Sequence, residues 1–424
     1  MGTYVGLDLG TSGVRAVAID DMGKVCAKAA RPLPPSRRCG SRVAQRPADW
    51  WEGVVGVLEV LLEQITPGEV RSIAVDGTSG TLLLTDADGR PLTEALMYDD
   101  ARADAQLRRI KRVAPARSAA AGGGSALARM LHLQSECPAA RHALHQADWI
   151  AGCLMQRFGI SDENNALKLG YDPVSRGWPQ WISLLDVPER LLPAVVPPGE
   201  AIGHVASGLA RDLGLAPDAR VIAGTTDSVA AFLGTGAGQA GDAVTSLGST
   251  LVVKMLCERP VFAPEFSVYS HRLGDVWLVG GASNTGGAAL LEFFDVETLR
   301  RLSNRLDPGR TTGLDYYPLV GVGERFPIND PTMRSRTSPR PADDTVFLQG
   351  LLEGIARIEA SAYRLLESLG APSPKLVRTV GGGADNEAWT QIRTRFLGVP
   401  AASSEGAGAA YGAALLARRG VLNG

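Results

Sequence analysis

The sequence has little of what marks secreted, membrane-spanning or nucleic-acid-binding proteins. Its 424 residues include only five cysteines, which are scattered and form no C-x-x-C pair, so we expect a reduced compartment. No apolar run reaches the roughly 18 residues of a membrane span, and the first residues lack the charged and apolar regions of a signal peptide. Lys and Arg (43) nearly balance Asp and Glu (45), which argues against nucleic-acid or membrane partners. We therefore expect a cytoplasmic protein.

Several common catalytic signatures are also missing. The chain contains no G-x-x-x-x-G-K-[ST] phosphate loop, no G-x-S-x-G nucleophile turn and no Cys/His cluster with metal-ligand spacing. The segment "GAGQAG" (Gly236–Gly241) matches G-x-G-x-x-G, but it follows a predicted helix and precedes a predicted strand. A dinucleotide-binding turn requires the opposite order. The chemistry must therefore rest on carboxylates, hydroxyls and glycine-rich turns.

The length and the hydrophobic pattern predict two α/β domains. A single core stops growing at about 250–300 residues, so 424 residues exceed one core. Near the N-terminus the pattern predicts three strands, an amphipathic helix and a strand–turn–strand segment. Their expected ranges are 4–9, 14–19, 24–29, 47–65 and 71–92. Strands mixed with helices in this order indicate a mixed α/β layer.

The glycine-rich stretch before Asp242 marks the predicted junction, giving domains 1–238 and 239–424. Residues 127–200 of the first domain are expected to form helices and loops. The second domain is expected to open on strands, then to contain a long amphipathic helix over 345–370. A strand ending in "GGGADN" and an alanine-rich helix over 406–420 complete the prediction.

Three turns rich in glycine or small hydroxyl residues are candidates for phosphate binding: Gly10–Gly13, Gly248–Thr250 and Gly381–Gly383. Glycine lets backbone N–H groups approach a ligand closely, and such oriented amides bind phosphate oxygens. Each turn could instead be only a tight hairpin. Asp8 before the first turn and Asp227 after a predicted strand favour the phosphate interpretation.

The two aspartates fit the needs of phosphoryl transfer, which uses Mg²⁺, donors to the phosphate oxygens and a base for the attacking hydroxyl. A carboxylate beside a phosphate turn, such as Asp8, suits Mg²⁺ held through water. Asp227 is expected in the first turn of a helix, where an acid can also serve as a cap. It could instead accept the proton of a substrate hydroxyl, and both interpretations stay open at this point.

The order of these motifs resembles the FGGY carbohydrate kinases of the actin-like ATPase superfamily, over nearly the whole chain. The similar segments are "GLDLGTSGVRAV", "ADWWEG", "VDGTSG", "MYDDAR", "AGTTDSVAAFLG", "SLGST", "GVGERFPINDP", "GGGADN" and "GAGAAYGAALLA". The resemblance implies two actin-like (ribonuclease H-like) domains, each a mixed sheet flanked by helices, with a central cleft. It also implies an ATP- and Mg²⁺-dependent kinase acting on a small sugar.

The resemblance further implies roles for individual residues. Asp227 would be the general base, Asp8 would hold Mg²⁺, and Asp8, Thr11 and Asp227 would lie close to the sugar. Ser79, Asp100 and Arg102 match sugar-side positions. The implied ATP-binding residues are Gly10, Thr11, Ser12, Gly248, Ser249, Thr250, Gly382, Gly383, Asn386 and Trp389. Of these, Gly382, Gly383 and Asn386 would surround the adenosine, and Trp389 would lie beside the base.

Some segments depart from the family pattern. Thr78, Ser79 and Gly80 are smaller than the residues many members have there, and "SALARMLHLQSECP" lacks the lysine and tryptophan of a family signature. We expect a ketopentose substrate, D-ribulose before D-xylulose, with glycerol or a hexulose as other possibilities. A nucleotide- and sugar-binding sensor and an actin- or chaperone-like ATPase are the alternative functions. The sequence does not fix the oligomeric state.

Overall fold

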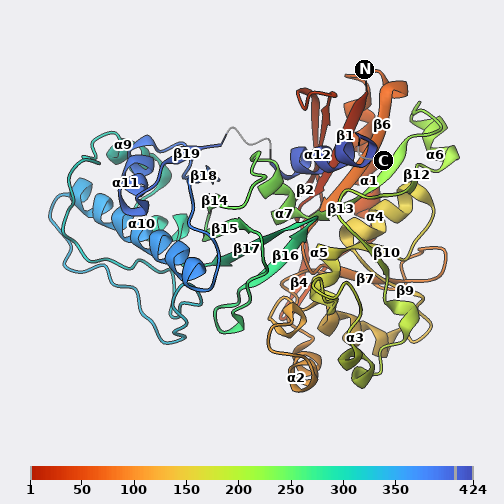
Figure 1. Cartoon of the computed structure of the whole chain (residues 1–424), viewed down its shortest axis with the longest axis horizontal. Coiled ribbons are helices and arrows are strands. Elements are labelled where there is room, and N and C mark those ends of the chain that lie inside the picture. The colour runs from red at the N-terminus through yellow and green to blue at the C-terminus, as the bar shows by residue number, and fades with distance from the viewer. Residues whose placement is uncertain (1, 405–407, 423–424) are drawn as a thin grey trace. The chain divides into compact units, whose positions relative to one another are not determined.

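The computed structural model describes residues 2–404 and 408–422, and the chain divides into two compact units (Figure 1). Unit 1 comprises Met1–Gly236, His271–Gly274 and Ala407–Gly424, and unit 2 comprises Ala237–Ser270 and Asp275–Gly406. The first change of unit falls two residues before the predicted junction. The C-terminal helix, which the sequence analysis placed in the second domain, is grouped with unit 1.

Unit 1 is built on a six-stranded mixed sheet. Its strands, in spatial order, are β12 (Ala201–His204), β13 (Arg220–Thr226), β6 (Val70–Gly77), β1 (Thr3–Leu9), β2 (Gly13–Ile19) and β3 (Val25–Pro32). The three central strands β13, β6 and β1 are parallel, while β1–β2, β2–β3 and β12–β13 are antiparallel. The carboxyl ends of the three parallel strands therefore meet at one edge of the sheet.

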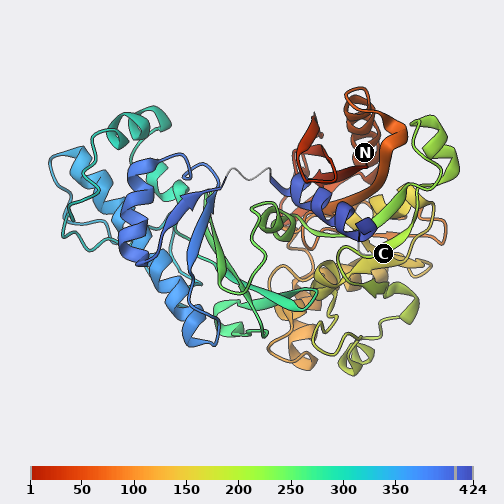
Figure 2. The ribbon, with the colours of Figure 1, turned by 45° about the horizontal axis from the view of Figure 1, so that its top comes forward.

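Helices cover both faces of this sheet, so β1 is buried on both sides. Leu7 belongs to the core that contains α1 (Pro47–Leu62), whereas Tyr4 belongs to the core that contains α12 (Gly408–Leu422). Because side chains alternate along a strand, Gly6 and Asp8 share the α12 side with Tyr4. A Cβ on Gly6 would lie 2.0 Å from the carbonyl oxygen of Ala410, so glycine is required there. Figure 2 shows α12 in blue beside the red N-terminal strands.

A smaller sheet and several helices complete unit 1. The small sheet contains, in spatial order, β4 (Arg37–Cys39), β5 (Arg42–Gln45), β8 (Ala95–Leu96), β7 (Leu82–Thr85) and β9 (His142–His145), and a separate pair contains β10 (Ile160–Asp162) and β11 (Ala194–Val196). The remaining helices are α2 (Asp104–Val113), α3 (Ala126–Glu136), α4 (Gln146–Met155), α5 (Glu163–Ala166), α6 (Ser207–Asp212) and α7 (Asp227–Leu233). The strands β9, β10 and β11 lie where helices and loops were expected, because three or four residues are too short to show a period.

Unit 2 contains the second six-stranded mixed sheet, apart from residues 271–273 of its edge strand β16, which are grouped with unit 1. Its order is β16 (Tyr269–Leu273), β17 (Val276–Ala282), β15 (Leu251–Cys257), β14 (Asp242–Leu247), β18 (Leu376–Val380) and β19 (Ala401–Ser403). Its helices are α8 (Gly287–Leu291), α9 (Val296–Ser303), α10 (Asp344–Ser368) and α11 (Glu387–Leu397). The long helix α10 contributes to both hydrophobic cores of this unit, which is why its buried face is broad.

The two sheets share one strand plan. In unit 1 the antiparallel hairpin β1–β2 has β6 parallel to its first strand, and in unit 2 the hairpin β14–β15 has β18 parallel to its first strand. A further parallel strand follows in each, β13 and β19. The fold is thus the predicted one, two α/β domains each with a mixed sheet flanked by helices.

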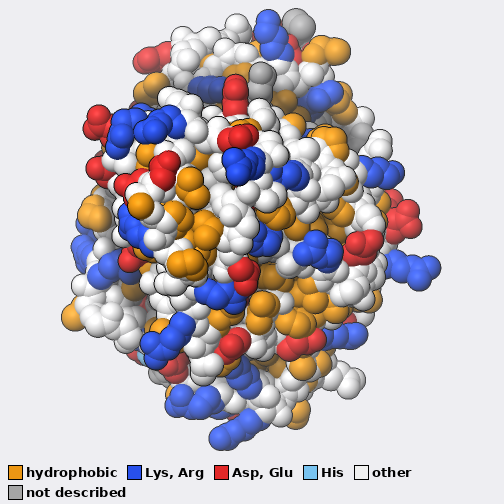
Figure 3. Space-filling model, turned by 90° about the vertical axis from the view of Figure 1, so that its left-hand side faces the viewer, with side chains coloured by type: hydrophobic (Ala, Val, Ile, Leu, Met, Phe, Trp, Pro, Cys, Tyr) orange, Lys and Arg blue, Asp and Glu red, His pale blue; other side chains and the backbone are white. Residues whose placement is uncertain are grey.

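The helices and one face of the surface agree with the low mean hydropathy and the balanced charge of the sequence. Within 2–404 and 408–422, none of the helices combines the length and the apolar character needed to cross a membrane. On the face shown in Figure 3, acidic and basic side chains are interspersed with apolar ones. That face therefore has no continuous patch of one charge.

Candidate functional site

Three aspartates meet at the carboxyl ends of the parallel strands of unit 1. Asp8 on β1 is directly opposite Asp76 on β6, and Asp76 is opposite Thr225 on β13. Asp227 comes two residues after Thr225 and begins α7. The sequence analysis selected Asp8 and Asp227 but not Asp76, which lies between them in the sheet order.

Asp76 is a fully buried carboxyl group, and when it and Asp8 are both ionised neither of its oxygens receives a hydrogen bond in the described part of the chain. Burial raises its pKa well above the usual range, and the negative charges of Asp8 and Asp227, together with a hydrogen bond to the Asp8 carboxyl group, add to this effect. An unpartnered buried acid is costly to stability. Such a residue is typical of a functional site rather than of a packed core.

We expect Asp76→Asn to raise the melting temperature at neutral pH. The folded-state pKa lies above the unfolded value, so this carboxyl group reduces stability progressively as pH rises above about 4. Asparagine has no charge to bury, so the gain over the native chain should grow from pH 4 to pH 7. Calorimetry across this range checks it. Asp330→Asn in unit 2 is the control, because hydrogen bonds from Thr332 lower the pKa of Asp330; an equal gain there, or a pH-independent gain at Asp76, would contradict the prediction.

The first predicted phosphate turn, Gly10–Gly13, is stabilised by hydrogen bonds from buried side chains. The backbone carbonyl of Thr11 accepts a hydrogen bond from Gln45 Nε2 at 2.8 Å, and Gln45 Oε1 accepts one from Trp50 Nε1 at 2.8 Å. The N–H of Gly10 donates to the carbonyl of Gly13 at 3.0 Å, which closes the turn. Thr11 and Ser12 are exposed, so their hydroxyls lie where a ligand could reach them.

Asp227 is placed by an irregular end of β13. The pairing of β13 with β6 shifts register between Ile222 and Thr225, and a Cβ on Gly224 would lie 1.7 Å from the carbonyl oxygen of Val75. Glycine therefore permits a bulge that redirects the chain into α7. Asp227 Oδ1 accepts a hydrogen bond from the N–H of Ser228 at 2.7 Å, and the carboxylate remains half-buried.

The predicted sugar-side residues Ser79, Asp100 and Arg102 differ in burial and in how many hydrogen bonds their side chains make. Ser79 is half-buried at the tip of the turn after β6, between Thr78, which donates to Gln146 Oε1 through its N–H and its hydroxyl, and Gly80. The Asp100 side chain is fully buried: Oδ2 accepts from the N–H of Val43 at 2.7 Å, and both oxygens accept from Arg102 Nε. In this structure Asp100 and Arg102 thus shape the loop that carries them.

Unit 2 brings its two predicted turns together. Because β14 and β18 are parallel neighbours, with Ser246 opposite Val380, the turns that follow them share one edge of the sheet. The N–H of Gly383 donates to the carbonyl of Leu247 at 3.1 Å. Gly381 has a φ of +88° and a Cβ there would lie 2.8 Å from the same carbonyl oxygen, so glycine is required.

The turn Gly248–Thr250 rests on the start of α8. The N–H of Gly287 donates to the carbonyl of Gly248 at 2.9 Å, and the N–H of Ala288 donates to that of Ser249 at 3.1 Å. Ser249 and Thr250 are exposed, and Gly248 is partly so. The hydroxyls of this turn are therefore accessible, as in the first turn.

The two adenosine-side residues are used for packing in the structure. Asn386 caps α11, accepting from the N–H of Trp389 at 2.9 Å, and its amide donates to Ser303 Oγ at 2.9 Å. Trp389 is 3% exposed and lies in a core of unit 2. A Cβ on Gly383 would lie 2.6 Å from the Trp389 ring. The ring thus supports the turn from beneath, whereas the resemblance implied a place beside the base; Gly382 is exposed.

Glu324, in the "GVGERFPINDP" segment, is a supporting residue that the sequence analysis did not select. Its buried carboxylate accepts from Ser283 Oγ (2.5 Å), the N–H of Asn284 (2.8 Å) and the Tyr317 hydroxyl (3.0 Å). Burial, followed by the charge of Glu324, raises the pKa of Tyr317. The N–H of Leu251 in turn donates to the carbonyl of Thr285 at 2.7 Å, so Glu324 fixes the loop that borders the second turn.

The carboxylates suit a sparsely ligated hard cation. Within residues 2–404 and 408–422 no group of three or more His, Cys, Asp and Glu side chains could hold a metal ion. Mg²⁺ usually keeps several waters and is bound by one or two carboxylates plus substrate phosphates. Asp8 offers such an oxygen ligand beside the first turn, and Arg15 Nη1 lies 3.1 Å from its Oδ2. The donor set thus fits Mg²⁺ with a phosphate and not a protein-only metal site.

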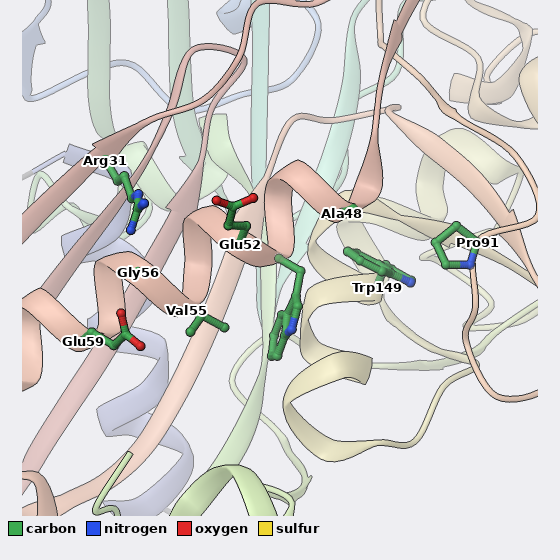
Figure 4. A pocket seen from close by; sticks show the side chains of 9 residues that line it. Arg31, Ala48, Glu52, Val55, Gly56, Glu59, Pro91 and Trp149 are labelled. Atoms are coloured by element: carbon green, nitrogen blue, oxygen red, sulfur yellow. The ribbon is translucent and has the colours of Figure 1, made fainter. Parts of the chain in front are cut away.

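Two hollows on unit 1 differ in their relation to these residues. One of about 510 Å³ is lined by Asp8 and Arg15, by parts of β2 and β3, and by the start of α12. Another of about 650 Å³ lies over α1, where Trp51, Val55 and Trp149 form an apolar wall near Arg31 and Glu59 (Figure 4). The second hollow contains none of the predicted site residues, so it is not the phosphate site.

The repeated hairpin-and-parallel-strand plan, the glycine-hydroxyl turns and the aspartate cluster define an actin-like, two-domain phosphotransferase. Comparison with known families makes this specific. Residues 3–234 match the N-terminal domain of the FGGY family of carbohydrate kinases, and residues 243–421 match its C-terminal domain. The chain therefore belongs to the FGGY family and is an ATP-dependent sugar kinase, a phosphotransferase with an alcohol acceptor.

Individual relatives agree on the class and differ in substrate. The xylulose kinase of Staphylococcus epidermidis is 24% identical over 436 residues, covering 98% of this chain and 88% of the relative. The gluconokinase of Bacillus subtilis is 22% identical over 426 residues, covering 92% and 81%. Among solved structures, a xyloylose kinase from Brucella ovis has a TM-score of 0.90 at 25% identity, covering 100% and 91%.

Proposed function

We propose that this kinase transfers the γ-phosphoryl group of ATP to a terminal hydroxyl of a ketopentose. The observation that carries the proposal is the cluster of Asp8, Asp76 and Asp227 at the ends of three adjacent parallel strands. In open α/β sheets, ligands bind outside the carboxyl ends of the strands. The cluster stands next to the exposed hydroxyls of Thr11 and Ser12.

Each group in unit 1 then has a distinct task. Asp227 accepts the proton of the attacking hydroxyl, which makes that oxygen a better nucleophile. Thr11, Ser12 and the N–H groups of their turn donate hydrogen bonds to the transferred phosphoryl group, which carries spread negative charge in the transition state. Asp8 would hold Mg²⁺, and the ion, when bound, would neutralise phosphate charge. Asp76 lies on β6, between the strand that carries Asp8 and the strand that Asp227 follows.

In unit 2 the paired turns bind the nucleotide. Gly248, Ser249 and Thr250 contribute amides and hydroxyls to phosphate oxygens, since helix- and turn-supported N–H groups are natural anion ligands. Gly382 and Gly383 allow the adenosine to approach the backbone closely. Asn386 and Trp389 act through the turn that they support.

The acceptor contacts Ser79, whose hydroxyl stands at the tip of the turn between two anchored neighbours. Asp100 and Arg102 fix the adjoining loop. Of Thr78, Ser79 and Gly80 only Ser79 is partly exposed, and we place D-ribulose before D-xylulose as the acceptor that contacts it. The relatives named xylulose kinase make D-xylulose the competing acceptor. The reaction takes place in the cytoplasm, with the sugar and ATP as small-molecule partners.

A coupled assay of ADP release tests the proposal. The native chain with Mg·ATP is offered D-ribulose, D-xylulose, D-gluconate, glycerol and a hexulose at matched concentrations. We expect a ketopentose to give the largest kcat/KM, and D-ribulose to exceed D-xylulose. Larger turnover with gluconate or glycerol would reject the ketopentose. A larger value for D-xylulose would reject only the order of the two ketopentoses.

A further inference from the structure

Arg129 on α3 is a buried guanidinium that the catalytic roles above do not use. It is 2% exposed, and its neighbours Ala128 and Met130 on α3 belong to a hydrophobic core of unit 1. Five backbone carbonyl oxygens accept hydrogen bonds from its two terminal nitrogens. The accepting carbonyls are those of Gly80, Tyr98, Asp100, Gly124 and Ser125.

These carbonyls belong to three segments that are far apart in the sequence. Gly80 is in the turn that carries Ser79, and its carbonyl oxygen accepts a hydrogen bond from Arg129 Nη1 at 3.2 Å. Tyr98 and Asp100 are in the loop that carries Arg102, and both accept from Nη2. Gly124 and Ser125 form the start of α3. One side chain thus connects both sugar-side segments to a helix.

The turn that carries Ser79 is fixed at its Gly80 end by Arg129 and by the start of α3. Gly80 has a φ of +91°, and a Cβ there would lie 2.8 Å from the carbonyl oxygen of Gly124, so the turn and the α3 start are in close contact. Thr78 anchors the other end through Gln146. Ser79 therefore lies between two fixed points, one of which is the Arg129 guanidinium.

The burial of this charge is not explained by an ion pair. Burial lowers the pKa of Arg129 to about 10, opposed by the more distant charges of Asp100 and Asp99. A buried charge without a direct carboxylate partner is poor for stability compared with an apolar side chain. What arginine offers instead is a rigid, planar fork with five N–H donors, which can fix several acceptors in one geometry.

We propose that Arg129 is a positioning residue for the acceptor sugar, holding the Ser79 turn and the Asp100 loop in the geometry that binds the sugar. The inference rests on the proposed function, because it assigns those segments to the acceptor. Misplacement of a substrate by about 1 Å can cost about a hundredfold in rate. Loss of Arg129 should therefore act on the sugar and not on the nucleotide.

Kinetics of Arg129→Met, Arg129→Lys and Arg190→Met test this role. Met should raise KM for the ketopentose about tenfold to a hundredfold and leave KM for ATP unchanged. Lys should recover part of the loss, because an ammonium has three donors and cannot serve all five carbonyls. Arg190 is the matched control: it donates to the carbonyls of Pro138 and Ala140, so its loss should leave both KM values unchanged.

Hydrogen exchange gives a readout that needs no substrate. In Arg129→Met, or in Arg129→Lys should Met prevent folding, backbone amides of residues 78–81 and 98–102 should exchange faster than in the native chain. Unchanged exchange, or equal increases of KM for sugar and ATP, would overturn the inference. A native chain that no sugar accelerates would instead reject the proposed function, and exchange would still decide whether Arg129 fixes the two segments.

Discussion

Asp227→Asn should lower ketose-dependent ADP release by about a hundredfold to ten-thousandfold, the range that a positioned general base contributes. Asparagine keeps the size and hydrogen-bonding oxygen of aspartate but cannot take up the proton of the attacking hydroxyl. Binding of ATP should be unchanged, because Asp227 is assigned to the proton of the sugar and the ATP-binding turns, one in unit 1 and two in unit 2, keep all their residues. Steady-state rates with the best ketopentose, and titration of ATP binding by calorimetry, measure the two effects.

A control in unit 2 separates the role of Asp227 as base from its place at a helix start. Asp227 is the first residue of α7, after the N-cap Thr226, and its Oδ1 accepts from the N–H of Ser228, whereas Asp295 caps α9 by accepting from the N–H of Thr298 at 2.7 Å. Asparagine keeps the accepting oxygen and is nearly as good a cap as aspartate, so Asp227→Asn and Asp295→Asn should both melt within a few degrees of the native chain. Only Asp227→Asn should lose turnover. Ketose-dependent turnover close to the native rate would remove Asp227 from the role of base.

The first strands and helices could be predicted from the sequence because their signals are local. The expected strand 4–9 is β1, Thr3–Leu9, and the expected helix 47–65 is α1, Pro47–Leu62. The acid in the apolar strand was also readable, because Asp8 precedes a turn of glycine and hydroxyl residues. Local signals reveal a turn or a period, but not which distant strand lies beside it.

Asp76 is a residue of the candidate site that local sequence signals did not predict. It stands in "VDGTSG", a segment that the family resemblance assigned to the sugar side, and nothing nearby in the chain distinguishes it from a strand-end acid. Asp76 becomes part of the candidate site only through the strand register, which places it opposite Asp8, 68 positions earlier in the sequence.

Side-chain partners explain the other differences. Asp100 is bound by the N–H of Val43, 57 residues away, and Asn386 by Ser303. A family pattern identifies the segment near a ligand, but the contacts of each side chain depend on tertiary neighbours. Likewise, the alanine-rich pattern of the C-terminal helix predicts a helix, whereas its packing on Gly6 requires the assembled sheet.

Arg393→Met should destabilise unit 2 by about 3–5 kcal/mol, the cost of leaving a buried charge without its partner. Arg393 and Glu359 are both 0% exposed, with Arg393 Nε and Nη2 at 2.7 and 2.6 Å from the Glu359 oxygens. Thr245 donates to the same carboxylate, and Thr379 accepts from Arg393 Nη1. These threonines are on β14 and β18, shortly before the two nucleotide turns, so the ion pair ties together the strands that present them. Urea unfolding and calorimetry measure the loss.

Two further variants test whether the loss of stability in Arg393→Met comes from the unpaired charge of Glu359. Arg393→Met combined with Glu359→Leu should regain most of the lost stability, because replacing both partners of a buried pair by apolar groups is often neutral. Arg340→Ala is the surface control: its pair with Asp344 is half exposed, and such pairs contribute about 0–1 kcal/mol. Its guanidinium also lies 4.4 Å from the centre of the Phe347 ring, a contact that contributes about 0.5–1 kcal/mol at exposed sites, so the total loss should stay below that of Arg393→Met. A double variant as unstable as Arg393→Met would assign the loss to packing around the guanidinium instead. If the pair also fixes the turns, ATP affinity measured well below the melting temperature should fall in Arg393→Met and stay at the native value in Arg340→Ala.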